Sequence, residues 1–204
     1  MKPEEVTERF RDLPALFKEM GFKVGVEIGV AKGRYSKWLL HGIPGLKLYL
    51  VDPWRSYDEY VEHHDEAGQV ILDDCLTEAH RRLDGKNVEF LRKTSMEAVE
   101  DFEDNSLDFV FIDGNHSFEY VIDDIAAWSK KVRPGGIVAG HDYWDSIDRS
   151  GWSDGTPLKD STLEETIKLC QVKTAVDAWV YANKINKLFI AKDDKCPSWF
   201  WIKE

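Results

Sequence analysis

The sequence predicts an α/β fold: a single doubly wound, mostly parallel seven-stranded sheet with helices on both faces and a C-terminal antiparallel hairpin. Five short apolar runs alternate with segments of helical periodicity, which is typical of strands buried on both faces of a parallel sheet. Only residues 192–197 separate the last two runs, too few for a crossover helix, so that pair is expected to be antiparallel. A chain of 204 residues fits one domain, 1–204.

The expected elements follow the period of the apolar residues along the chain. Helical spacing predicts an N-terminal helix over 4–20, within the segment 1–21, and further helices at 34–40, 57–83, 118–131 and 164–182. Apolar runs predict strands at 23–28, 46–51, 88–91, 108–112, 136–139, 187–191 and 198–203. Gly21 ends the first helix, and Asp52-Pro53 stops the second strand because proline lacks a ladder donor.

The charge balance of the chain indicates which classes of binding partner to expect. The chain has 27 Lys and Arg against 38 Asp and Glu, a formal charge of -11, which repels phosphate backbones and anionic membranes. We therefore expect neither a nucleic acid nor a membrane as partner. The first residues lack the apolar core of a secretory signal, and no run approaches the ~20 apolar residues that cross a bilayer. These features predict a cytoplasmic protein, and they do not indicate an oligomeric state.

A glycine-containing turn follows the first predicted strand. Glu27, Gly29 and Gly33 stand between that strand and the next helix, where glycine lets the backbone pass close to a ligand. Asp52 closes the second strand, and a carboxylate there can accept hydrogen bonds from both hydroxyls of a ribose. Together these residues predict a nucleoside site.

The same turn indicates which nucleoside. A dinucleotide site has the pattern GxGxxG, but Ala31 occupies the position of the second glycine. The Glu27 carboxylate would also repel a diphosphate, whereas it suits a ligand that carries an ammonium and a sulfonium group.

At these residues the chain resembles the class I S-adenosylmethionine-dependent methyltransferases. Residues 26–33 look like their first motif, 50–52 like their second, and 109–114 like the acidic strand end beside the methyl group. Residues 133–136 and the terminal hairpin extend the resemblance over about residues 22–204. It implies S-adenosylmethionine as cofactor. The cofactor-binding residues that it implies are Glu27, Gly29, Gly33, Asp52 and Asp113, with Ser95 and Met96 at the adenine.

Residues 112–117 and 140–143 look most like the small-molecule O-methyltransferase branch that includes macrolide-sugar and cephalosporin-pathway enzymes. That likeness implies methyl transfer to a hydroxyl of a small-molecule acceptor. It also implies a divalent ion such as Mg²⁺ or Mn²⁺ at Asp113, His141 and Asp142. His141 replaces a carboxylate of the family, and imidazole shifts the preference from magnesium toward manganese, iron or zinc. The catalytic residues expected are His116, Asp113 and His141.

Two other functions stay open. One is a nicotinamide-dependent reductase, in which Asp52 would again hold a ribose. The other is a non-catalytic module that binds S-adenosylmethionine. His116 could likewise cap the following helix instead of acting as a base. The long irregular segment 143–161 follows a strand end that faces the ligand, and we expect it to act as a lid over the acceptor.

Overall fold

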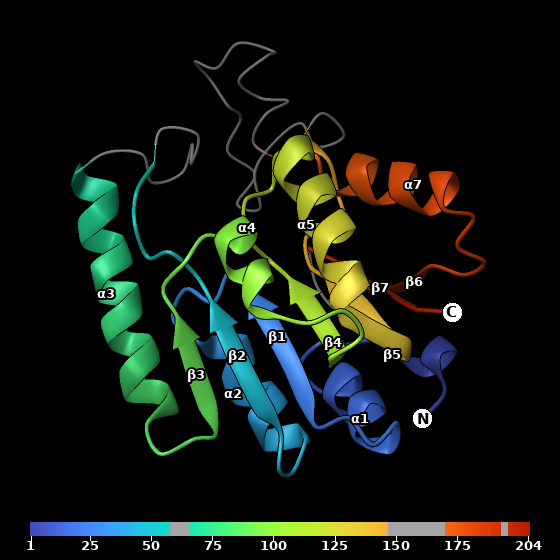
Figure 1. The fold of residues 1–204 in the computed structure, drawn as a ribbon, viewed down its shortest axis with the longest axis horizontal. Coiled ribbons are helices and arrows are strands. Elements are labelled where there is room, and N and C mark those ends of the chain that lie inside the picture. Colours follow the sequence, from blue (N-terminus) through green and yellow to red (C-terminus); the bar gives the residue numbers. More distant parts are fainter. Residues whose placement is uncertain (58–65, 147–169, 193–195) are drawn as a thin grey trace.

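The computed structural model describes residues 1–57, 66–146, 170–192 and 196–204 (Figure 1). One sheet of seven strands runs through the molecule in the order β3-β2-β1-β4-β5-β7-β6. The first five strands are parallel, and β7 is antiparallel to both of its neighbours. The predicted doubly wound sheet with a terminal antiparallel hairpin is confirmed.

The strands are short, as expected for segments buried on both faces. They are β1 (Val24–Ile28), β2 (Lys47–Val51), β3 (Val88–Leu91), β4 (Leu107–Ile112), β5 (Val132–Gly140), β6 (Phe189–Ala191) and β7 (Ser198–Ile202). The α-helices are α1 (Asp12–Glu19), α2 (Arg34–Gly42), α3 (Glu66–Leu83), α4 (Ser95–Ala98), α5 (Phe118–Lys131) and α7 (Val172–Ala182). Two 3₁₀ turns add η1 (Pro3–Glu5) and η2 (Val99–Asp101).

Alternate residues of the central strands supply two separate cores. On β4, Phe109 and Phe111 pack with the cluster beneath α1, α2 and α3, whereas Val110 and Ile112 pack with the cluster beneath α5 and α7. The helices therefore cover both faces of the sheet (Figure 1). This alternation follows from the period of two along a strand.

The N-terminal helix is shorter than predicted, and the expectation of a helix through segment 1–21 is wrong. The chain forms η1, leaves helical geometry, and re-enters it only in α1. The cause is Asp12, whose Oδ2 accepts hydrogen bonds from the backbone amides of Thr7 and Glu8 and from the Thr7 hydroxyl. These bonds satisfy amides before the helix begins, so periodicity alone placed its start too early.

Other boundaries move by a few residues. Helix α5 spans the predicted residues, while β5 is longer and begins at Val132. The short helix α4 was not predicted. Thr94 and Glu97 form a capping box at its start, and this spacing in the sequence could have indicated the helix. Residues 58–65, 147–161 of the expected lid, and 164–169 lie outside the described residues.

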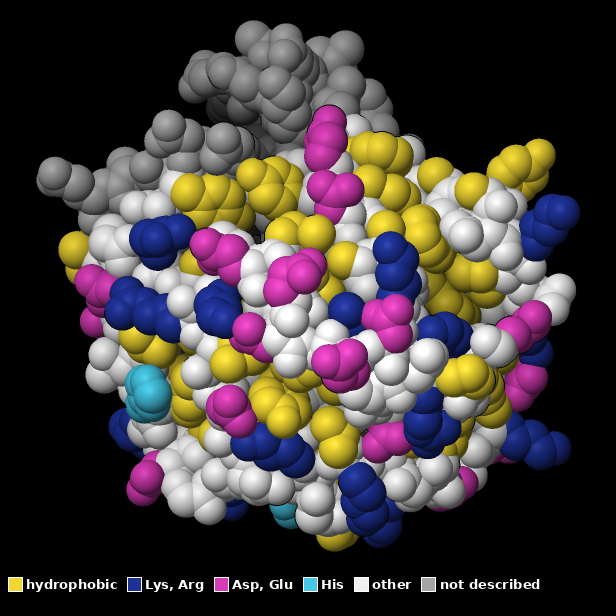
Figure 2. Space-filling view, viewed as in Figure 1, with side chains coloured by type: hydrophobic (Ala, Val, Ile, Leu, Met, Phe, Trp, Pro, Cys, Tyr) yellow, Lys and Arg dark blue, Asp and Glu magenta, His cyan; other side chains and the backbone are white. Residues whose placement is uncertain are grey.

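Charged side chains of both signs are interspersed over the face that carries α4 and α5 (Figure 2). No helix in the described parts of the chain combines the length and the apolar character needed to cross a bilayer. The cytoplasmic location stays a prediction.

Candidate active site

The carboxyl ends of four neighbouring strands lie level with one another. In the register of the sheet, Ile28 of β1 stands beside Val51 of β2 and Ile112 of β4, and Ile112 stands beside Gly140 of β5. The next residue of each strand therefore emerges at the same edge: Gly29, Asp52, Asp113 and His141. Because β1 and β4 flank the point where the strand order reverses, this edge is where such folds bind ligands.

A cavity of about 420 Å³ opens at this edge. Five of the predicted cofactor-binding residues line it: Gly29, Asp52, Ser95, Met96 and Asp113. Apolar side chains from the strand ends and from α3 complete the wall, among them Ile28, Val51 and Leu72. The cavity thus brings together most of the cofactor-binding residues that the sequence indicated.

Gly29 lies where β1 meets β4. Its φ of +78° is a left-handed conformation that glycine adopts without penalty. A Cβ atom added there would stand 1.9 Å from the carbonyl oxygen of Asp113 and 2.7 Å from the amide nitrogen of Gly114. Both are backbone atoms, so the close approach of the two strand ends requires glycine.

Gly33 lies where the start of α2 meets α3. It precedes α2 with a φ of 66°, and a Cβ atom there would stand 2.9 Å from Cδ1 of Leu83 on α3. Gly33 is absent from the residues that line the described cavity. The structure places it against α3, where it lets two helices pack closely.

Asp52 is bonded to the backbone around it. Its Oδ2 accepts hydrogen bonds from the amides of Val30, at 3.0 Å, and Ala31, at 2.9 Å, while Oδ1 accepts from the Trp54 amide at 2.7 Å. Trp54 in turn donates from Nε1 to the Ala31 carbonyl, at 3.0 Å. Burial raises the pKa of Asp52, against the opposing effect of these amides. Asp52 and Trp54 therefore hold the turn after β1 in place.

Glu27 is a buried acid beside the cavity. Its side chain on β1 is 2% exposed, and Oε2 has no hydrogen-bond partner among the described residues. Burial raises the pKa of Glu27 to about 8, and the charge of Asp113 adds to that effect. A buried acceptor of this kind needs a donor, and a ligand ammonium group would supply one.

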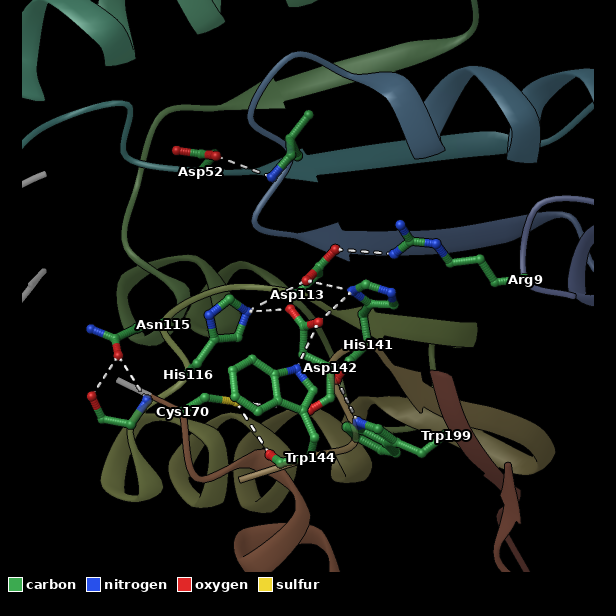
Figure 3. A network of polar contacts seen from close by, with 12 residues as sticks. Arg9, Asp52, Asp113, Asn115, His116, His141, Asp142, Trp144, Cys170 and Trp199 are labelled. Carbon is green, nitrogen blue, oxygen red and sulfur yellow. Dashed lines mark hydrogen bonds and ion pairs between the residues drawn. The ribbon is translucent and has the colours of Figure 1, made fainter. Parts of the chain in front are cut away.

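Arg9 is a site residue that the sequence analysis missed. Its Nη1 lies 3.6 Å from Oδ2 of Asp113, and its charge acts on Glu27 (Figure 3). The guanidinium lies over the rings of Phe10, at 4.5 Å, and Tyr35, at 5.6 Å. The segment before α1, which periodicity had assigned to a helix, thus delivers a cation to the strand ends.

Two histidines and two aspartates form a cluster next to the cavity (Figure 3). His116 Nε2 lies 3.1 Å from Oδ2 of Asp142 and 3.6 Å from Oδ1 of Asp113. His141 Nδ1 lies 3.2 Å from Oδ1 of Asp142 and 3.6 Å from Oδ1 of Asp113. Asp113 also lines the cavity, so it joins the two halves of the site.

The cluster is electrostatically paired. Burial disfavours every charged form, yet the two carboxylates raise the pKa of His141 to about 9 and that of His116 well above its usual value. The imidazoles in return lower the pKa of Asp113 to about 2 and also lower that of Asp142. The carboxylates therefore favour the imidazolium form of both histidines, and the histidines favour the ionised form of both aspartates.

The predicted metal ligands converge. Asp113, His141 and Asp142 each present a ligand atom, and these atoms lie within 4.8 Å of one another. Two carboxylates and an imidazole form a donor set that manganese, iron or zinc accepts and that suits magnesium less well. The residues present therefore fit a divalent ion, which would take the place of the imidazolium charge.

Surrounding groups hold the cluster. Trp199 Nε1 donates to the His141 carbonyl at 3.1 Å, and Trp144 Nε1 donates to Oδ1 of Asp142 at 3.2 Å (Figure 3). Asp142 has a φ of 53°, a left-handed conformation that aspartate tolerates better than most residues.

Residues 26–143 match the family model described as "Methyltransferase domain". The chain belongs to this family of methyltransferase domains. The match begins within β1 and runs past the end of β5, so it contains every strand end that forms the site.

Relatives of this methyltransferase domain include "Uncharacterized protein y4gI" of Sinorhizobium fredii, 28% identical over 120 residues, which are 59% of this chain and 12% of that protein. The chain spans less than a third of the length of the curated relatives it matches.

Two solved structures show the same fold. One is the O-methyltransferase TomG from Streptomyces achromogenes, involved in tomaymycin synthesis, in complex with SAM; it is 15% identical, with a TM-score of 0.63 over 96% of this chain and 80% of that one. The other is the O-methyltransferase from Bacillus cereus in complex with SAH, 16% identical, with a TM-score of 0.58 over 98% and 83%.

Proposed function

We propose that this methyltransferase domain binds S-adenosylmethionine and transfers its methyl group to a hydroxyl of a small-molecule acceptor. The observation that carries the proposal is the register of the sheet, which brings Gly29, Asp52 and Asp113 to one cavity beside the buried acid Glu27. Family membership and the SAM and SAH complexes of two proteins with the same fold support it.

In this proposal the chain binds the two ends of the cofactor with opposite charges. Glu27 accepts the methionine ammonium group, and Arg9 lies close enough to attract the methionine carboxylate. The chain passes beneath the methionine portion at Gly29, and Asp52 faces the ribose with the lone pairs that its three amide bonds leave.

Methyl transfer forms a bond from the acceptor oxygen to the methyl carbon as the carbon–sulfur bond breaks, releasing S-adenosylhomocysteine. Most of the rate then comes from holding the oxygen close to the methyl group and in line with it. The hydroxyl proton has to leave, and His116 or His141 would receive it. Because Asp113 and Asp142 raise the pKa of both imidazoles in the free protein, the base has to be in its neutral form first, and a cation bound to the two carboxylates would favour that form.

A divalent ion is the second part of the proposal. Asp113, His141 and Asp142 would hold it. When bound, such an ion lowers the pKa of a coordinated hydroxyl. Its charge would also compensate the two carboxylates, leaving His116 free to exchange a proton with the acceptor.

The reductase alternative is less well supported. A dinucleotide needs free backbone amides in the turn after β1 to bind its diphosphate, but Asp52 already accepts from two of them, those of Val30 and Ala31. Thermal unfolding with each ligand separates the two functions. A ligand at about 100 times its dissociation constant adds roughly 2.7 kcal/mol, so stabilisation by NADH and none by S-adenosylmethionine would reverse the assignment.

A non-catalytic binding module would bind S-adenosylmethionine and transfer nothing. The intact cluster of His116, His141, Asp113 and Asp142 favours catalysis. The deciding measurement is transfer of a labelled methyl group to a panel of phenols and sugar alcohols. Cofactor binding without transfer to any member of either class would favour the module.

Glu27→Gln is expected to stabilise the free protein and weaken its binding of the cofactor. The folded pKa of about 8 lies above the ordinary value of 4.5, so Glu27 lowers the stability progressively as the pH rises from about 4.5 to 8. The amide removes that cost, and the free energy of unfolding at pH 8 should rise by about 1 to 2 kcal/mol, with little change at pH 4.5.

Urea unfolding at both pH values measures the change in stability, and calorimetry should show affinity for S-adenosylmethionine reduced roughly 10- to 100-fold. Wild-type affinity should also increase as the pH approaches 8, because Glu27 binds the ammonium group as a carboxylate. The exposed Glu100→Gln is the matched control. Equal stabilisation by both variants, or unchanged affinity in Glu27→Gln, would contradict the assignment.

The metal proposal predicts that exhaustive chelation lowers methyl transfer at least about 10-fold, with recovery on adding back Mn²⁺ or Mg²⁺. Independently of activity, calorimetry should detect Mn²⁺ binding to the wild type and to Asp104→Asn, an exposed acid paired with Lys131, but not to Asp142→Asn. Full activity after chelation, together with its loss in His116→Ala, would instead assign the chemistry to the histidine alone.

A further inference from the structure

Asp124 is a buried acid that lines the same cavity. It lies on α5, is 5% exposed, and shares the lining of the cavity with Ser95 and Met96. Helix α4, which carries those two residues, packs beside α5 (Figure 1). Neither the proposed methyl transfer nor the proposed metal site uses this carboxylate.

A chain of hydrogen bonds orients Asp124. The Trp128 indole donates from Nε1 to Oγ of Ser95 at 2.7 Å, and the Ser95 hydroxyl bonds to the Asp124 carboxylate. Because the indole occupies a lone pair of Oγ, the hydroxyl hydrogen is the one that Ser95 gives to Asp124. Ser95 therefore acts as a support for Asp124, and the contact with the ligand falls to the carboxylate.

The carboxylate keeps acceptor capacity that the described residues do not fill. An ionised carboxylate has about four lone-pair sites, and Ser95 fills one. No cation in the described parts of the chain acts on Asp124; its only charged neighbour of note is another acid, Asp123. Burial raises the pKa of Asp124 to about 7, so a donor from the ligand would stabilise the ionised form.

The neighbours of Asp124 identify that donor. Ser95 and Met96 are the residues expected at the adenine, and Asp124 lines the same cavity and bonds to Ser95, so the base would lie within its reach. Adenine presents one exocyclic donor, its 6-amino group, whereas a 6-oxo purine presents an acceptor that a carboxylate repels.

Building on the proposed function, we propose that Asp124 accepts a hydrogen bond from the 6-amino group of adenine and thereby selects an adenosine cofactor over its 6-oxo analogue. Thr94, which follows β3, caps α4. In this proposal the acid reaches the base from α5.

Calorimetry with S-adenosylhomocysteine and S-inosylhomocysteine, its 6-oxo analogue, tests the proposal at pH 8. The wild type should prefer the 6-amino compound roughly 10- to 100-fold, which corresponds to one hydrogen bond to a charged group. Asp124→Asn should reduce the preference to about 3-fold or less, or invert it, since a carboxamide can either accept from an amino group or donate to an oxo group. The control is Glu119→Gln, an exposed acid on the same helix that is absent from the lining of the described cavity and should keep the wild-type preference.

A structural role for Asp124, holding α4 against α5, would lower the affinity for both compounds equally and overturn the proposal. Equal affinity of the wild type for the two compounds would also overturn it, and needs no variant that folds. Ser95→Ala, which removes the support, should reduce the preference by less than Asp124→Asn. Failure of the wild type to bind S-adenosylhomocysteine at all would overturn the proposed function, and this inference with it.

Discussion

Gly29→Ala should abolish measurable binding of S-adenosylmethionine, with an affinity at least about 100-fold lower than that of the wild type. The added Cβ would stand 1.9 Å from the Asp113 carbonyl oxygen, and both atoms belong to the ends of paired strands. The end of β4 has to move, and Asp113 moves with it. We also expect the free energy of unfolding to fall by about 3 to 5 kcal/mol, the range of large single-site effects.

Gly45→Ala is a matched control for that variant. Gly45 has the same φ of +78°, but a Cβ atom there meets nothing closer than the flexible Lys23 Nζ at 3.9 Å. It should therefore cost only the left-handed conformation, about 1 to 2 kcal/mol, and leave cofactor binding unchanged. Circular dichroism checks that both variants fold at the temperature of the calorimetry. Wild-type affinity in folded Gly29→Ala would show that this glycine serves only the turn.

Asp52→Ala should lose both stability and affinity. Its carboxylate satisfies the amides of Val30, Ala31 and Trp54, and truncation leaves them without that acceptor. We expect the free energy of unfolding to fall by about 3 kcal/mol, since each unsatisfied buried amide costs roughly 1 to 3 kcal/mol and water can reach some of them. Affinity for S-adenosylmethionine should fall about 10- to 100-fold, because the ribose contact and the shape of the turn are lost together.

Urea unfolding and calorimetry measure the two effects of Asp52→Ala. Asp84→Ala, at an exposed acid just after α3, should change stability by no more than about 0.5 kcal/mol. Asp52→Asn keeps one oxygen acceptor and should fall between the wild type and the alanine variant. Stability lost with affinity retained would show that Asp52 only shapes the turn and that the ribose binds elsewhere.

The pattern of apolar residues and the lengths of the links between them were sufficient to predict the architecture of the sheet. Continuous apolar runs such as 107–112 are buried on both faces, and a six-residue link before β7 permits only an antiparallel return. Placing Asp52 and Asp113 at one edge followed from the same pattern, because each comes directly after a parallel strand. Residues fixed by their position relative to a strand end could thus be found without knowing any contact across the fold.

Contacts between segments far apart in the chain determined which other residues reach the cavity. Arg9 reaches Asp113 because Asp12 interrupts the first helix, and Asp124 reaches the cavity because α5 packs beside α4. Gly33 carries the same motif signature as Gly29 but faces Leu83, a residue of another helix. The periodicity of apolar residues predicts whether a side chain is buried, but it does not predict which residue of another element that side chain contacts. The identity of that neighbour depends on how helices pack across the sheet. Here it separates glycines and acids that shape a turn or a helix contact from residues that line the cavity.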